Sequence, residues 1–279
     1  MTPRHAPWET SHDFQIGLKP IAPADWLEGG EADPAARKDP LIAAHRGLVW
    51  AEIPGSRPAQ AEALALVEAA LGQGALGRAA NPADMPPLYA AARRTPDDLC
   101  LMEKIDGQWR LTALSLSAGG FFTAEDAIGK SLGELHGPVT GFAERFLPRV
   151  ERVFEGLRSD LVLERRNWTV LNSDQLHTPS SAPIRARIGG IDPAEAGRVL
   201  HTRVERQTLR RLPQTGAALF TIRVWLSPLE RLAADPARLA AFARAWRSAT
   251  PGLRAYKRLD LYDDLVEGFL RQSGLGVSR

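Results

Sequence analysis

The sequence contains little cysteine and no long apolar run, and each shortage excludes a class of protein. Cys100 is the single cysteine among 279 residues, so the chain by itself forms no internal disulfide, zinc–cysteine cluster or iron–sulfur cluster. No apolar run reaches the ~20 residues that a transmembrane helix requires. Residues 1–14 are polar and lack the apolar segment of a signal peptide. A cytoplasmic location is therefore expected.

The sequence also lacks a strong excess of one charge. Lys+Arg number 35 and Asp+Glu number 33, which gives a formal net charge of +2. A nucleic-acid-binding protein usually shows a larger basic excess or a run of lysine, so neither nucleic acid nor a membrane is expected as a partner. A composition of 44% hydrophobic and 24% charged residues is that of an ordinary folded protein.

Hydrophobic periodicity predicts an α+β protein. The predicted order is a strand pair, helices, three strands and terminal helices, which favours a PAS-like central antiparallel sheet with helices on one side and helical N- and C-terminal extensions. Asp106-Gly107 is typical of a hairpin turn within the strand pair. The predicted strands are 47–53, 98–105, 109–117, 162–172, 201–210 and 217–226, and the predicted helices are 59–71, 123–136, one from about 148, 236–248 and about 256–272.

A single domain is expected over residues 1–279. Residues 1–46 are predicted to form an extended lead-in segment, residues 47–226 the sheet-and-helix core, and residues 227–279 the C-terminal helices. Residues 77–97 contain four prolines and are expected to be a loop.

Two short motifs resemble a nucleotide-binding signature and a hydrolase signature. Neither lies in the secondary structure that its signature requires. Residues 72–77 (GQGALG) match a dinucleotide fingerprint but follow a predicted helix instead of a strand, so a helix end and turn is expected there. Residues 129–133 (GKSLG) match the nucleophile elbow of hydrolases but lie inside a predicted helical stretch.

Two histidines are candidate metal ligands. His136 precedes Gly137 and Pro138 at a predicted helix end, where it either caps the last carbonyls or faces a large flat ligand. His177 lies in a loop, where it either binds nearby backbone or serves as an alternative ligand. The sequence has no histidine pair or cysteine–histidine spacing typical of zinc. Haem needs only one protein ligand because the porphyrin supplies four.

Arginine gathers on the three later strands. Arg165 and Asn167 are predicted on one side of a strand, with Arg166 and Trp168 on the other. The guanidinium group binds carboxylates in a bidentate manner, so this excess suits an anionic ligand, although a solvated sheet face would show it too. The next two strands and their approach carry Arg198, Arg203, Arg206, Arg210, Arg211 and Arg223 against one acid, Glu205.

These segments together resemble the haem-dependent oxidative N-demethylase family over nearly the whole chain. The longest matching piece is residues 204–223, which contains VERQTL, RLP, TG and FTIR. The other matching pieces are Gly17–Pro20 to Trp26, Gly129-Lys130, Leu132, Leu135-His136, Pro138-Val139, Arg165, Asn167-Trp168 and Tyr256-Lys257. The sequence departs from the family pattern at 118–122 and at Thr140.

The resemblance implies a haem-dependent monooxygenase that demethylates a small secondary amine such as dimethylamine with O₂ and releases formaldehyde. It implies haem b, with His136 as the iron ligand and His177 as the second candidate. The propionates are expected to meet Arg165, Arg203, Arg206 and Arg223, while Asn167 and Trp168 are expected at the catalytic pocket wall. Electrons are expected from NAD(P)H through a separate flavin and iron–sulfur reductase. The alternative is a non-catalytic PAS-like haem or ligand sensor.

Overall fold

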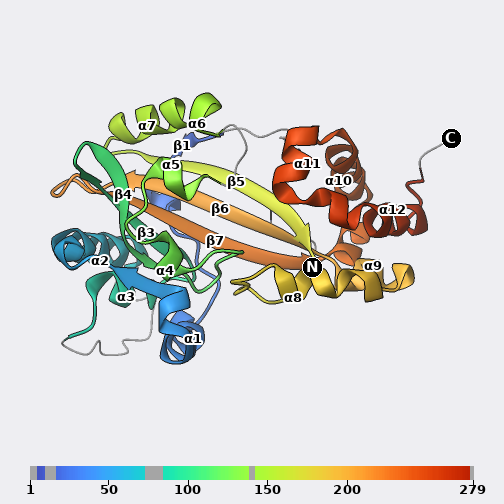
Figure 1. The fold of residues 1–279 in the computed structure, drawn as a ribbon, viewed down its shortest axis with the longest axis horizontal. Helices are drawn as coiled ribbons and strands as arrows, with labels where there is room; N and C mark the ends of the chain where they lie inside the picture. The colour runs from blue at the N-terminus through green and yellow to red at the C-terminus, as the bar shows by residue number, and fades with distance from the viewer. Residues whose placement is uncertain (1–4, 10–16, 73–83, 138–141, 277–279) are drawn as a thin grey trace.

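The computed structural model describes residues 5–9, 17–72, 84–137 and 142–276, and a seven-stranded antiparallel sheet forms its centre (Figure 1). The strand order is β1-β5-β6-β7-β3-β4-β2. The predicted α+β class with a central antiparallel sheet is confirmed. The strands are β1 Lys19–Ile21, β2 Trp50–Glu52, β3 Asp98–Ile105, β4 Gln108–Ser115, β5 Val162–Leu171, β6 His201–Arg211 and β7 Ala218–Pro228.

The predicted strand pair and the three later strands form the body of the sheet. Asp106 and Gly107 both have positive φ, 50° and 78°, as the predicted two-residue hairpin turn between β3 and β4 requires. Strands β5, β6 and β7 form a continuous meander, and β7 then pairs with β3. The observed order of strand pair, helices and three strands is therefore the one that the sequence predicts.

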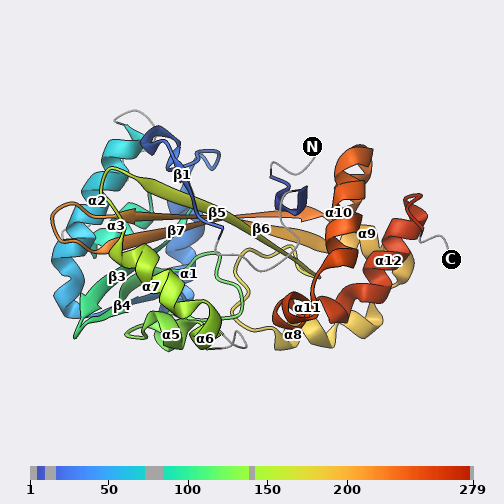
Figure 2. The same cartoon turned by 90° about the horizontal axis from the view of Figure 1, so that it is seen from above.

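Helices cover both faces of the sheet, whereas the sequence predicted helices on one face only. In Figures 1 and 2, α6 and α7 lie on one side of the sheet and α2 and α3 on the other. Among the described residues, no helix is long and apolar enough to span a membrane. The helices are α1 Pro34–Val49, α2 Arg57–Leu71, α3 Pro87–Ala92, α4 Ala124–Ala127, α5 Leu132–Leu135, α6 Phe142–Arg145, α7 Leu147–Glu155, α8 Ala182–Ala186, α9 Ala196–Val199, α10 Pro236–Ser248, α11 Pro251–Lys257 and α12 Asp263–Gln272.

Two helices replace segments that the sequence predicts as extended or loop. Helix α1 occupies the second part of the predicted lead-in, because Pro34 sits in the first helical turn and the Asp33 carboxylate accepts a hydrogen bond from the N–H of Ala36. It runs to Val49, so the strand predicted over 47–53 shortens to β2. Helix α3 likewise begins at a proline, Pro87. Residues 77–97 were expected to be a loop because of their four prolines, but a proline in the first helical turn favours a helix start, as Pro34 and Pro87 show.

Two predicted helices are divided. The stretch 123–136 forms α4 and α5, separated by Gly129 at φ 77°. The stretch 256–272 contains the end of α11 and then α12, with Arg258 in the left-handed region at φ 52° between them. The first division matters most, because it leaves His136 at the C-terminal end of the short helix α5.

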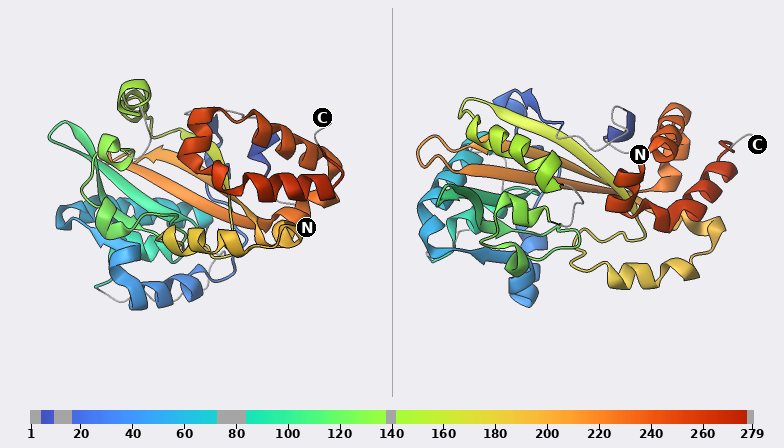
Figure 3. Two further views of the ribbon diagram at one scale, coloured as in Figure 1. Left: turned by 45° about the vertical axis from the view of Figure 1, so that its right-hand side comes forward. Right: turned by 45° about the horizontal axis from the view of Figure 1, so that its top comes forward.

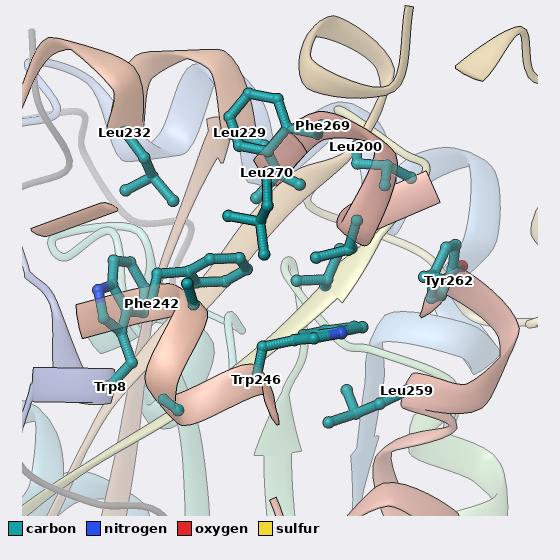
Figure 4. Close-up of a cluster of buried hydrophobic side chains, with 14 of the residues drawn as sticks. Trp8, Leu200, Leu229, Leu232, Phe242, Trp246, Leu259, Tyr262, Phe269 and Leu270 are labelled. Carbon is teal, nitrogen blue, oxygen red and sulfur yellow. The ribbon is translucent and has the colours of Figure 1, made fainter. Parts of the chain in front are cut away.

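Three hydrophobic clusters hold these layers together. One lies between the sheet and α2–α3, and a second lies on the opposite face beneath α4, α5 and α7. The third joins α9–α12 to the far end of β5, β6 and β7, as Figure 3 shows. In this third cluster Trp8 and Phe242 pack with ring centroids 5.6 Å apart, close to Trp246 (Figure 4). The middle of the sheet lies between these clusters, and polar residues occupy it.

Candidate functional site

Five polar side chains occupy one face of β5 and β6 between the hydrophobic clusters. The register pairs Arg165 with Gln207, Asn167 with Glu205, and Thr169 with Arg203. Directly opposed residues of antiparallel strands project to the same face, so these side chains share a side of the sheet. We call it the polar sheet face, defined by Arg165, Asn167, Arg203, Glu205 and Gln207.

His136 stands beside this face at the end of α5. Its Nδ1 lies 2.8 Å from the carbonyl oxygen of Leu132, which only accepts, so Nδ1 carries the proton and Nε2 holds the lone pair. The ring stacks on Phe142, the first residue of α6, with centroids 4.3 Å apart. Burial lowers the pKa of His136 despite the Leu132 bond, and the Arg165 charge lowers it further. A neutral imidazole with a fixed Nδ1–H is the form that ligates metals.

A hydrogen-bonded chain crosses the polar sheet face. Arg165 Nε donates to Gln207 Oε1 at 2.6 Å, and Gln207 Nε2 donates to Glu205 Oε2 at 2.9 Å. The other Glu205 oxygen accepts from Arg203 Nε at 3.1 Å. Burial pushes the pKa of Glu205 upward, but Arg203 and the other donors outweigh it and leave that pKa below its usual range. The carboxylate therefore stays ionised between two guanidinium groups.

Helix α11 adds two residues that the sequence analysis did not assign to the site. Tyr256 is within electrostatic range of Glu205 and Arg165, and both interactions affect its pKa, which burial raises. Lys257 Nζ donates to the backbone oxygen of Trp168 at 2.5 Å, and burial lowers the pKa of Lys257 to about 8. The Tyr256-Lys257 pair was visible in the sequence only as a matching piece, because its partners are distant along the chain; Trp168 lies 89 positions from Lys257.

Arg206, one of the predicted anion-binding arginines, is not brought together with His136. It lies on the face opposite His136, where it is 2% exposed. Its guanidinium binds the Glu164 carboxylate and the backbone oxygens of Asp25 and Trp26. Arg206 therefore fastens the segment before α1 to the sheet, and each of its three guanidinium nitrogens already donates a hydrogen bond within the protein.

Arg223 and Trp168 also face away from the polar sheet face. Arg223 pairs with Arg206 in the β6–β7 register and meets Glu31 at 3.5 Å. Trp168 packs in the third hydrophobic cluster, 5.7 Å from both Trp8 and Phe242. Strand alternation places both residues on the other side of the sheet, so this arrangement does not bring them together with His136, and their roles at the site stay predictions.

Arg203 lies on the polar sheet face, but each of its three guanidinium nitrogens already donates a hydrogen bond within the protein. Besides Glu205 it binds the backbone oxygen of Leu176 at 3.1 Å and that of Ala118 at 2.5 Å. These two oxygens belong to loops 118–122 and 172–181, so Arg203 ties both loops to β6. Of the four predicted propionate partners, Arg165 and Arg203 lie on this face, and Arg165 Nε donates to the side chain of Gln207. Thr140, the second departure from the family pattern, lies outside the described residues.

His177 lies at the other end of the same sheet face. One row across the sheet runs from Arg165 through Gln207 and Ile222 to Asp98. His136 is within electrostatic range of the first of these residues, and His177 within range of the last. Three strand spacings of ~4.8 Å separate the two ends, roughly 14 Å. Burial lowers the pKa of His177, so this ring also stays neutral.

The described residues contain no group of three or more His, Cys, Asp or Glu side chains placed to hold a metal ion. A pocket does occur elsewhere, between α10 and the end of the described chain, where Arg244, Arg247 and Gly274 are among its lining residues. None of the predicted site residues contributes to it. A metal at the polar sheet face would therefore need ligands of its own, as haem provides.

The fold and the site define an α+β protein with a neutral, anchored histidine beside a cation-rich sheet face. Residues 73–267 match the family model described as haem-dependent oxidative N-demethylase, alpha subunit-like. The chain belongs to this family. The match includes the hairpin, His136, the three-stranded meander and the Tyr256-Lys257 pair.

Proposed function

We propose that this protein is the haem-binding oxygenase subunit of a demethylase that removes an N-methyl group from a small secondary amine such as dimethylamine and releases formaldehyde. The observation that carries the proposal is His136, an imidazole with its Nδ1 anchored and its Nε2 lone pair available, beside a cationic sheet face in a chain of a haem-dependent family. The PAS-like layout remains part of the proposal, supported by the order of strand pair, helices and meander.

The chemistry of His136 and of the cations near it supports haem b as the proposed cofactor. His136 would hold the haem iron, because its Nδ1–H is fixed by Leu132 as the second coordination sphere of a ligating histidine requires. Arg165 and Lys257 would meet the anionic propionates, since both are cations within electrostatic range of one another beside the polar sheet face. Haem at this site would supply the redox chemistry of C–H oxidation.

The chain's own residues would bind and orient the reactants. Phe142 stacks on His136 and fixes the plane of the imidazole. The Arg165–Gln207–Glu205–Arg203 chain holds the polar side chains of this face in single positions. Asn167, opposite Glu205 in the register, remains the proposed contact for the amine. Preorganised polar groups of this kind orient a substrate without a cost of rearrangement.

The proposal includes a partner that delivers electrons. Cys100 is buried on the sheet, and burial raises the pKa of its thiol, so the chain's one cysteine is no cluster ligand. A family described as alpha subunit-like implies further subunits. We expect NAD(P)H to feed a separate flavin and iron–sulfur protein, in the cytoplasm, which then reduces this subunit.

The test is reconstitution of the purified protein with haem, followed by absorption spectroscopy. The wild type is expected to show a Soret band, and His136→Ala is expected to lose the histidine-ligated spectrum. His201→Ala is the matched control, because the His201 Nδ1 is also anchored by a backbone oxygen, 3.0 Å from that of Val199. Absence of haem binding by the wild type would contradict the proposal.

Formaldehyde release then separates an enzyme from a sensor. The reconstituted protein is expected to release formaldehyde from dimethylamine with O₂ and a chemical reductant. A protein that binds haem through His136 but never releases formaldehyde would be the non-catalytic ligand-binding module, the alternative that the sequence left open.

A further inference from the structure

The imidazole of His177 is buried at both ring nitrogens without a partner. Neither Nδ1 nor Nε2 has a hydrogen bond within the described part of the chain, and each is closed off from solvent. The hydroxyl of Thr178, a residue 6% exposed, is in the same condition. Buried polar groups are nearly always paired, and leaving one unpaired destabilises the folded protein. A molecule bound beside these adjacent groups would complete their hydrogen bonds.

The backbone around His177 is built rigidly into the fold. Phe121 N–H donates to the Thr178 oxygen at 2.7 Å, and Thr178 N–H donates to the Gly119 oxygen at 3.0 Å. Phe121 takes a positive φ of 64°, which is unfavourable for a non-glycine residue, so its conformation depends on these bonds. The loops 118–122 and 172–181 thus form one double-stranded wall at the edge of the polar sheet face.

Arg203 is the side chain that attaches this wall to the sheet. It is 3% exposed, and its two Nη atoms bind one backbone oxygen in each loop, those of Leu176 and Ala118. Its Nε binds Glu205, the one acidic side chain on this face of β5, β6 and β7. A single guanidinium therefore sets the position of the wall relative to the hydrogen-bonded chain that leads to Arg165.

We propose that His177 is a second ligand-contacting residue of this site, which hydrogen-bonds the small molecule bound opposite His136, and that Arg203 is its positioning residue. The inference rests on the proposed function. It makes His177 a hydrogen-bonding partner of the bound small molecule and not a ligand of the iron. His136 has the backbone anchor that a metal-ligating histidine requires, whereas neither nitrogen of His177 has one among the described residues. An unanchored neutral imidazole offers one donor and one acceptor to a small polar molecule.

The positioning role is tested without haem, by hydrogen exchange of the apoprotein. Arg203→Lys keeps the charge but removes the planar fork, and peptides covering 118–122 and 176–180 are expected to exchange about tenfold faster. Arg206→Lys is the matched control, because Arg206 is as buried as Arg203 but lies on the other face. This variant is expected to speed the hydrogen exchange of residues 25–26 instead. Equal exchange of the wall peptides in both variants, or no change in either, would overturn the positioning role.

The contact to the ligand is tested with cyanide on the haem-loaded ferric protein. His177→Phe keeps a ring of similar shape but offers no hydrogen bond, and the dissociation constant of cyanide is expected to rise about fivefold. His45→Phe, the neighbouring histidine on α1, is expected to leave it unchanged. Haem binding with equal cyanide affinity in the wild type and His177→Phe would refute the contact and leave the proposed function intact. If the wild type binds no haem, both fail together, which the wild-type spectrum alone reveals.

Discussion

At the scale of single residues, the side-chain chemistry of an arginine did not show which face of the sheet it would occupy or which anion it would bind. Arg203 and Arg206 are three positions apart in a strand, both are nearly fully buried, and both bind a glutamate and two backbone oxygens. They nonetheless lie on opposite faces of the sheet. The sequence indicated that some arginines would meet an anion, but only the positions of Glu164 and Glu205 show that the protein itself supplies the anion for these two.

Replacement of Arg206 by methionine is expected to destabilise the protein by about 1–3 kcal/mol, because the backbone oxygens of Asp25 and Trp26 lose their donor. The Glu164 carboxylate loses one of its two cationic partners and keeps Arg166 at 2.9 Å. The measurement is the urea midpoint of unfolding, followed by circular dichroism. Arg158→Met is the control, since Arg158 and Asp160 form an exposed pair whose loss is expected to leave the midpoint in place. A midpoint of Arg206→Met equal to that of the wild type would show that the contacts of Arg206 contribute no net stability.

At the scale of elements, one carboxylate docks the β6–β7 turn onto α2. Glu62 accepts from the N–H groups of Gln214 and Thr215 at 2.6 and 2.8 Å and from the Thr215 hydroxyl. Burial raises the pKa of Glu62, yet these donors outweigh it and leave the pKa below its usual range. The contribution to stability therefore requires the ionised form, is complete above about pH 4.3, and is lost as pH falls through the folded-state pKa.

Glu62→Gln is expected to lose about 1 kcal/mol of stability at pH 7. The difference from the wild type is expected to shrink steadily in urea titrations run towards pH 3, because the wild-type carboxyl then becomes neutral too. Glu68→Gln, on the same helix, is the control for the effect of removing a charge from α2. A gap between Glu62→Gln and the wild type that stayed constant with pH would exclude the ionised carboxylate as its source.

The packing of α9 against α12 depends on a glycine for close approach. A methyl group added at Gly197 would lie 2.8 Å from Cδ2 and 3.0 Å from Cε2 of the Phe269 ring. Gly197→Ala is expected to cost about 1–3 kcal/mol, since a buried ring has no space to withdraw. Gly189→Ala, where nothing lies within 4 Å, is expected to be nearly neutral. Thermal unfolding of the two variants measures the contrast, and equal midpoints would show that α12 shifts freely.

At the scale of the whole molecule, periodicity predicted the strands well because each strand is a local pattern. The Asp106-Gly107 turn and the alternation of Arg165 and Asn167 against Arg166 and Trp168 were predicted and are confirmed. What the sequence did not indicate is long-range pairing. The row from Arg165 to Asp98 and the contact of Lys257 with Trp168 join segments that are 67 and 89 positions apart, so no local pattern encodes them.

The row from Arg165 to Asp98 lies between separate hydrophobic clusters, and a ligand bound beside it would stabilise the whole molecule. A ligand that binds only the folded chain stabilises it by about 2.7 kcal/mol at a concentration 100 times its Kd. For a chain of this size that corresponds to a rise in Tm of roughly 5 °C or more.

Haem is therefore expected to raise the Tm of the wild type in proportion to the logarithm of the haem concentration, and to raise the Tm of His136→Ala much less. His201→Ala is expected to behave like the wild type, because its imidazole is anchored in the same way but stands at the start of β6, away from Arg165. A haem-dependent Tm that persisted fully in His136→Ala would place the cofactor elsewhere on the molecule.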